Sequence, residues 1–530
     1  MLQKLKTQTQ AYWQDEFAVS IRDLEFVYSL LIETGLPLDT TQIAQAIVEQ
    51  RLDEELNQVR MNLKRGRAFQ PQGTFHVGEG LVFPALDCAY GVVVNERLGY
   101  NPEYGSFRVI EVQFDGENKT REFAATLSSP HKLNVGDSID DILASLSNIP
   151  AAEIVSIYGP MIERKLENSL VHAENMDFTR FGSQWYLKGL LADVHIGYRN
   201  IIEAVIDVTG RPLAPRELLK QIELPAEVRP EAQLFSLNYW LQQDERFDDV
   251  GTDMQVMWYL RRLEPTETQF PPRRLVATTE TYDRALLTED LLRMERELDD
   301  EMSLLDLSGV EATDVPAVSL VLTYPHRRVG TIPLNKRIRQ LFPKGSYQHT
   351  RITLVDGQTG SPMPAWVMHQ HKYISGLEEW FKKNSILVGG YITLEKTDEP
   401  LKVIINYIPK RERREWIRVV RSDGERLRFE MKKQACRCEY DELMVLGEDK
   451  AQEVDALWVK AETELTPIIE VLHQVFPELA KLNPQGTVHA KTIYLAANLL
   501  RRCPPGPVFA ALVGDASFVP VGDGYWVYNE

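Results

Sequence analysis

The chain has few cysteines and no long apolar run. Four cysteines in 530 residues exclude a disulfide framework and are typical of proteins from a reducing compartment. A membrane-spanning helix needs about 18 or more consecutive apolar residues, and the sequence contains no such run. The opening segment, MLQKLKTQTQ, lacks the apolar core of a signal peptide. We therefore expect a cytoplasmic protein without a membrane partner.

Signatures of catalysis are also missing. The sequence contains no Walker loop, no GxGxxG after a strand, no HExxH and no GxSxG. Asp423, Glu430 and Lys432 resemble the metal-binding pattern of restriction-type nucleases, but this pattern is short and common by chance. Two fragments fall short of the four ligands of a structural zinc site, namely His369-x-His371 and Cys436-x-Cys438. We expect no catalytic residues, no cofactor and no metal.

Negative charge dominates the chain except in one stretch. The net charge is -18, yet residues 318–421 hold 18 Lys and Arg against 8 Asp and Glu, a net of about +10. A local excess of cations is what a phosphate-binding module needs, because neutralising phosphates releases counterions. Any binding of nucleic acid is therefore expected to be local, with duplex DNA as the partner.

The basic stretch has a regular order of strands and short helices. Strands are predicted at 318–323, 330–335, 350–355 and 365–368, and helices at 336–342 and 376–383. This order, with the segments IPLNKRIRQLFP and GLEEWFKKNSILVGG, resembles the B-three DNA-binding pseudobarrel over about a fifth of the chain. The alternative is a small β-barrel whose basic loops are only solvated.

The resemblance implies two loops that enter the major groove. By position these are 324–328 and 368–372, and the basic helix after the second strand lies in the same region. Arginine there would contact phosphate or guanine edges. The DNA-binding residues expected in this domain are Tyr324, His326, Arg327, Arg328, Lys336, Arg337, His369, Gln370, His371 and Lys372.

A phrase recurs outside the basic stretch. Thr34-Gly-Leu-Pro-Leu38 matches Thr209-Gly-Arg-Pro-Leu213, and in both copies an isoleucine follows the threonine by thirteen residues. Helical periodicity surrounds each copy, and the second copy ends in an FDDVG hairpin. This resembles the HARE-type winged helix found in a subunit of bacterial RNA polymerase and in chromatin-linked and restriction-linked proteins. The chain also ends on such a hairpin, so a third copy is expected from about 465 to 530.

The copies differ in charge. In the first we expect helices at 21–34, from 40 and at 52–64, followed by a hairpin over 73–83, with Arg60, Lys64 and Arg67 facing phosphate. Acids near the end of the second copy would repel DNA and favour a protein partner.

Between the copies, strands at 91–94, 107–114 and 121–127 predict an SH3-like barrel. An acidic amphipathic helix over 282–307 is either a dimer arm or a connecting helix packed on its neighbour.

The predicted fold class is multi-domain α+β, with two or three winged helices, a small SH3-like barrel and a B-three-like pseudobarrel. The predicted segments are a first winged helix (1–84), the SH3-like barrel (85–135), a helical connector (136–185), a second winged helix (186–264), a linker with the acidic helix (265–312), the pseudobarrel with an extra hairpin (313–450) and a third winged helix (451–530).

We expect a non-enzymatic DNA-binding protein at the nucleoid, either a transcription regulator or a DNA-targeting subunit. One alternative is a Mg²⁺-dependent nuclease that uses Asp423, Glu430 and Lys432. Another is an interaction scaffold that docks on RNA polymerase or on a nuclease or helicase subunit. The sequence is also compatible with a homodimer.

Overall fold

The structure is a computed structural model of the chain, and it shows a mixed α+β protein with several separate sheets. It describes residues 5–86, 88–117, 119–129, 131, 150–173, 177–252, 254–277, 280–303, 316–342 and 348–529. These form two compact units, Met1–Arg199 with Ile222–Gln243, and Asn200–Gln221 with Asp244–Glu530. Among the described residues, no helix is both long enough and apolar enough to cross a membrane.

The first unit begins with two helices, α1 (Ile21–Thr34) and α2 (Thr40–Arg65). Ser20 caps α1 by accepting from the Asp23 amide, and Gly35 ends it with φ +60°. The prediction of two helices between 40 and 64 is wrong, because α2 is continuous. Its sequence contains neither glycine nor proline, so nothing interrupts the helix.

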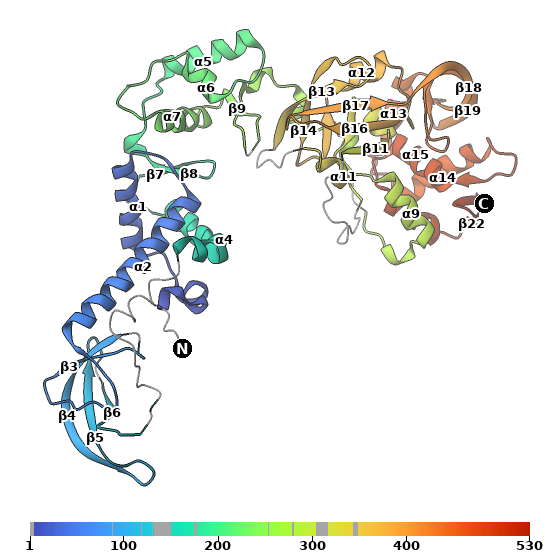
Figure 1. Cartoon of the computed structure of the whole chain (residues 1–530). Helices are drawn as coiled ribbons and strands as arrows, with labels where there is room; N and C mark the ends of the chain where they lie inside the picture. The colour runs from blue at the N-terminus through green and yellow to red at the C-terminus, as the bar shows by residue number, and fades with distance from the viewer. Residues whose placement is uncertain are drawn as a thin grey trace. The chain divides into compact units, whose positions relative to one another are not determined.

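A five-stranded sheet follows α2 directly in the chain (Figure 1). Its strands stand in chain order as β2 (Arg67–Ala68), β3 (Gly80–Phe83), β4 (Ala89–Asn101), β5 (Gly105–Phe114) and β6 (Thr120–Ala125). The hairpin expected over 73–83 is wrong, since β3 pairs with β4 and belongs to this sheet. The predicted boundary at 84/85 is wrong for the same reason. Five phenylalanines fill the interior, namely Phe69, Phe75, Phe83, Phe114 and Phe123.

The chain then returns to the helices through α4 (Ala151–Val171) and the hairpin β7 (Phe178–Phe181) and β8 (Gln184–Leu187). Strand β1 (Leu38–Asp39) pairs with β8, which gives a small sheet in the order β1-β8-β7. The segment predicted as a helical connector, 136–185, therefore supplies the third helix and the hairpin of the first copy. Residues 136–149 and 174–176 of the predicted connector lie outside the described residues.

In the second copy, the expected helices and hairpin are confirmed as elements. They are α5 (Ile196–Thr209), α6 (Pro215–Leu219), α7 (Pro230–Gln242), β9 (Phe247–Asp249) and β10 (Trp258–Leu260). The last part of the chain contains α13 (Ala451–Thr463), α14 (Ile468–Ala480), β21 (Val488–His489), α15 (Ala490–Leu500), α16 (Pro505–Gly514), β22 (Phe518–Gly522) and β23 (Tyr525–Tyr528).

One strand pairing recurs in all three copies. Each copy has a glycine with φ between +60° and +66°, and two or three residues later the chain pairs with a buried tryptophan. This tryptophan lies in the second strand of the hairpin that ends the copy. The pairs are Leu38 with Trp185, Leu213 with Trp258, and Val488 with Trp526. The same topology is thus built three times, and in the first copy the five-stranded sheet is inserted before the third helix.

The linker contains a shorter helix than expected. Helix α9 spans only Glu289–Leu298, because Thr288 caps it and Asp299 ends it with φ +45°. Residues 304–307 of the predicted helix lie outside the described residues. Leu291 and Met294 on α9 are buried in the same core as α16. The apolar face of the helix is thus covered within the chain, as expected for a connecting helix and not for a free dimer arm.

The basic stretch forms a mixed seven-stranded sheet in the order β11-β16-β17-β13-β14-β15-β12. Its strands are β11 (Ala317–Val321), β12 (Thr331–Pro333), β13 (His349–Asp356), β14 (Pro362–Met368), β15 (Tyr373–Ser375), β16 (Tyr391–Lys396) and β17 (Lys402–Tyr407), with helices α10 (Tyr324–Val329), α11 (Lys336–Arg339) and α12 (Glu378–Lys383). Only the β13–β17 pair of this sheet is parallel. The predicted order of strands and helices is confirmed, except that 324–328 is a helix.

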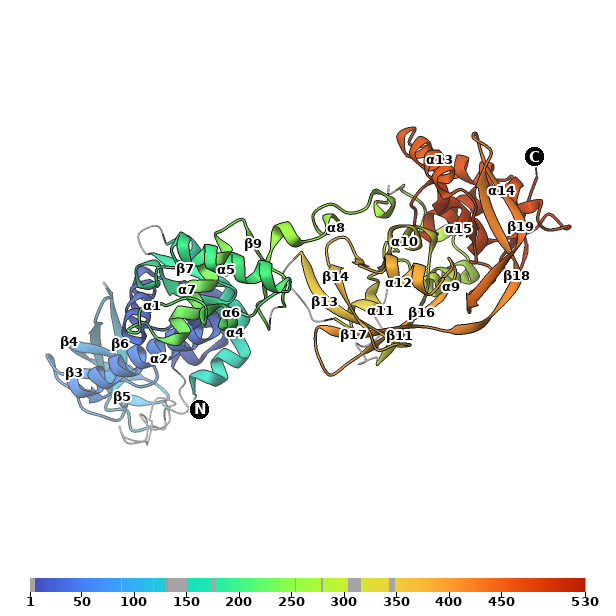
Figure 2. The same cartoon turned by 90° about the horizontal axis from the view of Figure 1, so that it is seen from above.

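A long two-stranded ribbon follows the sheet (orange in Figure 2). It consists of β18 (Pro409–Ser422) and β19 (Leu427–Cys438), which form the extra hairpin expected in this segment, with β20 (Gly447–Glu448) beside β18. The turn end of the ribbon packs through Val420 and Phe429 on the core that contains α14 and α15.

Candidate functional site

The first predicted DNA-binding loop is buried. Tyr324 and His326 are 0% and 1% exposed, inside helix α10. Arg327 Nε donates to the carbonyl of Ile386 at 2.7 Å, and burial lowers the pKa of its guanidinium. Arg328 forms an ion pair with Asp455. The prediction of an exposed arm is therefore wrong, because proline at the first turn and a closing Gly330 make this segment helical.

The second group is partly exposed. Helix α11 and the 369–372 turn lie together, since Arg339 Nη2 donates to the His369 carbonyl at 3.2 Å. Arg337 is paired with Asp299 at 2.5 Å, His369 Nε2 contacts Thr350 Oγ1 at 3.0 Å, and Lys372 Nζ donates to the Glu301 carbonyl at 3.2 Å. The exposed members besides Arg337 are Lys336, Gln370 and His371. These residues thus lie at one surface, where Arg337 and Lys372 already contact groups of the same chain.

The basic residues of the first copy are exposed. Arg60 and Lys64 lie one turn apart on α2, and Arg67 lies on the edge strand β2 with its guanidinium 5.8 Å from the Phe75 ring. Arg65 between them is paired with Asp115 at 2.6 Å. This surface belongs to the first unit, whereas the basic stretch belongs to the second.

A third basic surface, on the β18–β19 ribbon, was missed by the sequence analysis. Trp416 is 61% exposed, and Lys433 faces it across the strands with Nζ 5.4 Å from the ring. Because side chains alternate along a strand, Arg414 and the 44% exposed Met431 share this face. The ribbon thus presents an apolar ring flanked by cations.

Several exposed cations of the ribbon are not engaged in ion pairs. Arg411, Arg413, Arg414, Arg421 and Lys433 are exposed and form no ion pair among the described residues. By contrast, Lys410 is paired with Glu415 at 3.0 Å and Arg437 with Glu412 at 2.8 Å. The run Lys410-Arg-Glu-Arg-Arg414 is evident in the sequence, but only the strand register shows that Arg414 shares a face with the exposed Trp416 and Lys433.

The residues of the nuclease alternative are engaged elsewhere. Asp423 accepts from the amides of Arg426 and Glu425 within its own turn and pairs with Arg428 at 2.7 Å, and these contacts hold the pKa of its carboxyl well below the usual range. Lys432 Nζ lies 3.1 Å from Asp449 and 4.0 Å from Glu430.

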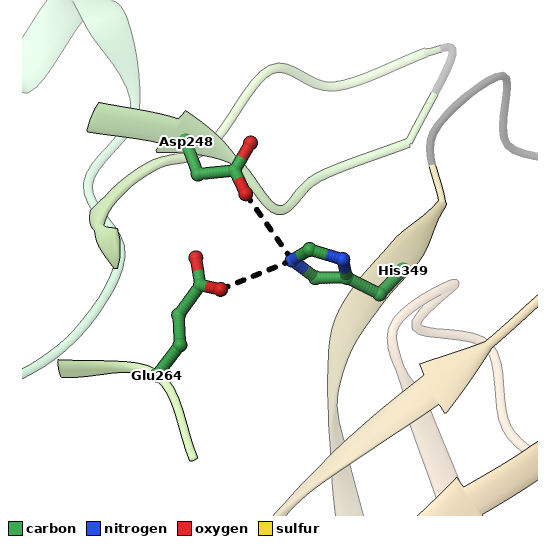
Figure 3. Close-up of side chains that lie close together, drawn as sticks. All are labelled: Asp248, Glu264 and His349. Carbon is green, nitrogen blue, oxygen red and sulfur yellow. Dashed lines mark ion pairs between the residues drawn. The ribbon is translucent and has the colours of Figure 1, made fainter. Parts of the chain in front are cut away.

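One group of potential metal ligands does converge among the described residues (Figure 3). His349 Nε2 lies 3.3 Å from Asp248 Oδ2 and 3.3 Å from Glu264 Oε2. The histidine begins β13, the aspartate is on β9, and the glutamate follows β10 in the linker. The three residues are far apart in sequence, so no local motif indicates them.

Burial makes this cluster electrostatically unusual. The side chains of Glu264 and His349 are 1% and 11% exposed. Burial lowers the pKa of His349, but the two carboxylates outweigh it and raise the pKa to about 9. Glu264 also accepts from Thr268 Oγ1 at 3.3 Å. The cluster opens into a cavity of about 510 Å³ that His371, Gln348 and Met368 also line.

Comparisons of the chain with protein families, with curated proteins and with solved structures find no match.

Proposed function

We propose that the protein is a non-enzymatic, multi-domain protein that binds duplex DNA through the β18–β19 ribbon. The observation that carries this proposal is the set of five exposed ribbon cations that form no ion pair among the described residues, two of which, Arg414 and Lys433, share the face of the exposed Trp416. The chain has a net charge of -18, so it does not need these few cations for solubility. Their concentration on one ribbon favours binding to phosphate groups.

The dimensions of the ribbon support this proposal. The major groove of B-DNA is about 12 Å wide and admits a two-stranded ribbon, whose strands lie about 4.8 Å apart. The guanidinium groups of Arg413 and Arg414 would contact phosphates or guanine edges. The Trp416 ring would pack on sugar or base, because its face is open to solvent.

The predicted domain types remain part of the proposal. The threefold strand pairing at a buried tryptophan supports winged helices of the HARE type for all three copies. The strand order in the basic stretch supports a B-three-like pseudobarrel, and the phenylalanine-filled five-stranded sheet supports a small SH3-like barrel. In this assignment the third copy packs within the second unit, since Lys491 and Arg501 are paired with Glu297 and Glu280.

The test measures binding of the full chain to a short fluorescent duplex by anisotropy at two salt concentrations. In the ribbon variant, Arg413, Arg414 and Lys433 are replaced by alanine. We expect weaker binding and a salt slope smaller by up to about 3 units, since each lost phosphate contact removes about one. Trp416→Ala is expected to cost about 1–3 kcal/mol with little change in slope, because it removes stacking and not charge.

Matched controls use the other exposed cations. A variant with Arg60, Lys64 and Arg67 replaced by alanine removes the same charge from the first unit and is expected to leave the affinity nearly unchanged. If this control loses affinity and the ribbon variant does not, the first copy is the DNA-binding surface. If the wild type does not bind duplex at low salt, the scaffold alternative takes the place of this proposal.

A further inference from the structure

We propose that Asp248, Glu264 and His349 bind one divalent transition-metal ion. The ligands are a carboxylate oxygen from each acid and Nε2 of the histidine, and the site fastens the β9–β10 hairpin to strand β13 of the seven-stranded sheet (Figure 3).

The spacing of the three atoms supports this inference. Bonds from a divalent transition metal to nitrogen and oxygen are about 2.0–2.2 Å long, so neighbouring ligand atoms lie about 2.8–3.6 Å apart. His349 Nε2 is 3.3 Å from each carboxylate oxygen. Both distances from the histidine therefore match the spacing around a bound ion, and all three ligand atoms lie within 4.8 Å of one another.

The hydrogen bonding of the cluster is incomplete without an ion. Glu264 is almost fully buried, yet its Oε1 atom has no hydrogen-bond partner. Nε2 of His349 faces both carboxylates but is aligned for a hydrogen bond to neither, and Nδ1 also has no partner. Asp248 is 23% exposed and has a long contact of 3.8 Å to Arg261, whereas the Glu264 side chain is 1% exposed. Two carboxylates that converge on one nitrogen in this setting are costly unless a cation compensates them.

The surroundings leave room for further ligands. The cavity next to the cluster has a volume of about 510 Å³ and is lined by Thr268, Gln269 and His371 as well as the three ligands. Water molecules can complete the coordination shell from this side. One imidazole with two carboxylates suits Mn²⁺, Fe²⁺ and Zn²⁺ better than Ca²⁺ or Cu⁺, and the usual order of affinities puts Zn²⁺ above Mn²⁺.

The experiment uses the full chain after removal of metals with a chelator. Equilibrium dialysis against Zn²⁺ and, separately, Mn²⁺ is followed by elemental analysis, and we expect one tightly bound Zn²⁺ per chain with weaker Mn²⁺. Glu264→Gln and His349→Gln are expected to lower the Zn²⁺ affinity on the order of 100-fold or more. Glu267→Gln is the matched control, because this exposed neighbour loses the same charge and lies outside the cluster.

Thermal unfolding separates metal binding from misfolding. Zn²⁺ should raise the unfolding midpoint of the wild type and of Glu267→Gln, and should leave that of Glu264→Gln unchanged, because only a state that binds the ion is stabilised. If a variant does not fold, Asp248→Asn takes its place. The inference is overturned if the wild type binds no stoichiometric Zn²⁺, or if the ligand variants bind it as the wild type does.

Discussion

Replacing Arg502 by glutamine should destabilise the second unit strongly. The guanidinium of Arg502 binds Asp300 through two hydrogen bonds of 2.8 Å and Glu301 through one of 2.6 Å. All three side chains are at most 3% exposed. Glu301 also meets His326 at 3.2 Å, which connects the linker to helix α10. The network thus joins three segments that are far apart in the sequence.

The size of the effect follows from burial. Removing one partner of a buried ion pair leaves an uncompensated charge and costs about 3–5 kcal/mol. Here Arg502 is hydrogen-bonded to both carboxylates, so we expect the upper half of that range. Asp300 keeps its hydrogen bond from the Tyr494 hydroxyl at 2.6 Å, which offsets only part of the loss. Replacing Arg502 by methionine together with Asp300→Asn and Glu301→Gln should recover much of the stability, because no buried charge remains.

Urea unfolding followed by tryptophan fluorescence measures these changes. Arg293→Gln is the control, since this arginine is 65% exposed and its pair with Asp290 is worth at most about 0.5 kcal/mol. If Arg502→Gln costs less than about 1 kcal/mol, the reasoning from buried charge is refuted. An equal loss in the triple variant would assign the effect to packing instead.

The same network gives a pH dependence with a definite sign. Burial raises the pKa of the Glu301 carboxyl, but Arg502 and His326 outweigh it and hold the pKa below its ordinary value of 4.5. A lowered folded-state pKa stabilises the protein above pH 4.5, and this contribution is lost as the pH falls below that value. Without Arg502, protonation of the buried Glu301 carboxyl removes an uncompensated charge and therefore stabilises the variant. The gap in unfolding free energy between wild type and Arg502→Gln should therefore narrow as the pH falls from 7 toward 4.

Two further outcomes are expected. Gly330→Ala should cost about 2 kcal/mol or more in the same unfolding assay, because φ is +70° and the new Cβ would lie 2.6 Å from Cβ of Glu378, whereas Gly360→Ala, with φ +70° and open space, should cost about 1 kcal/mol. Plasmid incubated with Mg²⁺ should stay uncut by the wild type and by Lys432→Ala alike; cleavage that depends on Lys432 would establish the nuclease alternative.

Local sequence was sufficient for most elements. Apolar periodicity and the Thr-Gly-x-Pro-Leu turn located α1, α5, α6 and α7, since these depend on contacts within a few residues. The strands of the basic stretch were found for the same reason. The hairpin repeat is also present in the sequence, as Trp185-Tyr-Leu187 matches Trp258-Tyr-Leu260. The relation is not evident in the sequence because the inserted sheet separates α2 from α4, the third helix of the first copy.

Tertiary structure decided which charged residues are available. The sequence favours Arg327 and Arg328 as DNA contacts. In the fold, Arg327 donates to the Ile386 carbonyl and Arg328 forms an ion pair with Asp455. The exposed face of Trp416 and the His349 cluster likewise depend on pairing between distant segments. Charge and periodicity are properties of neighbouring residues and can be read locally, whereas burial and ion pairing are set by whichever distant segment the fold brings alongside.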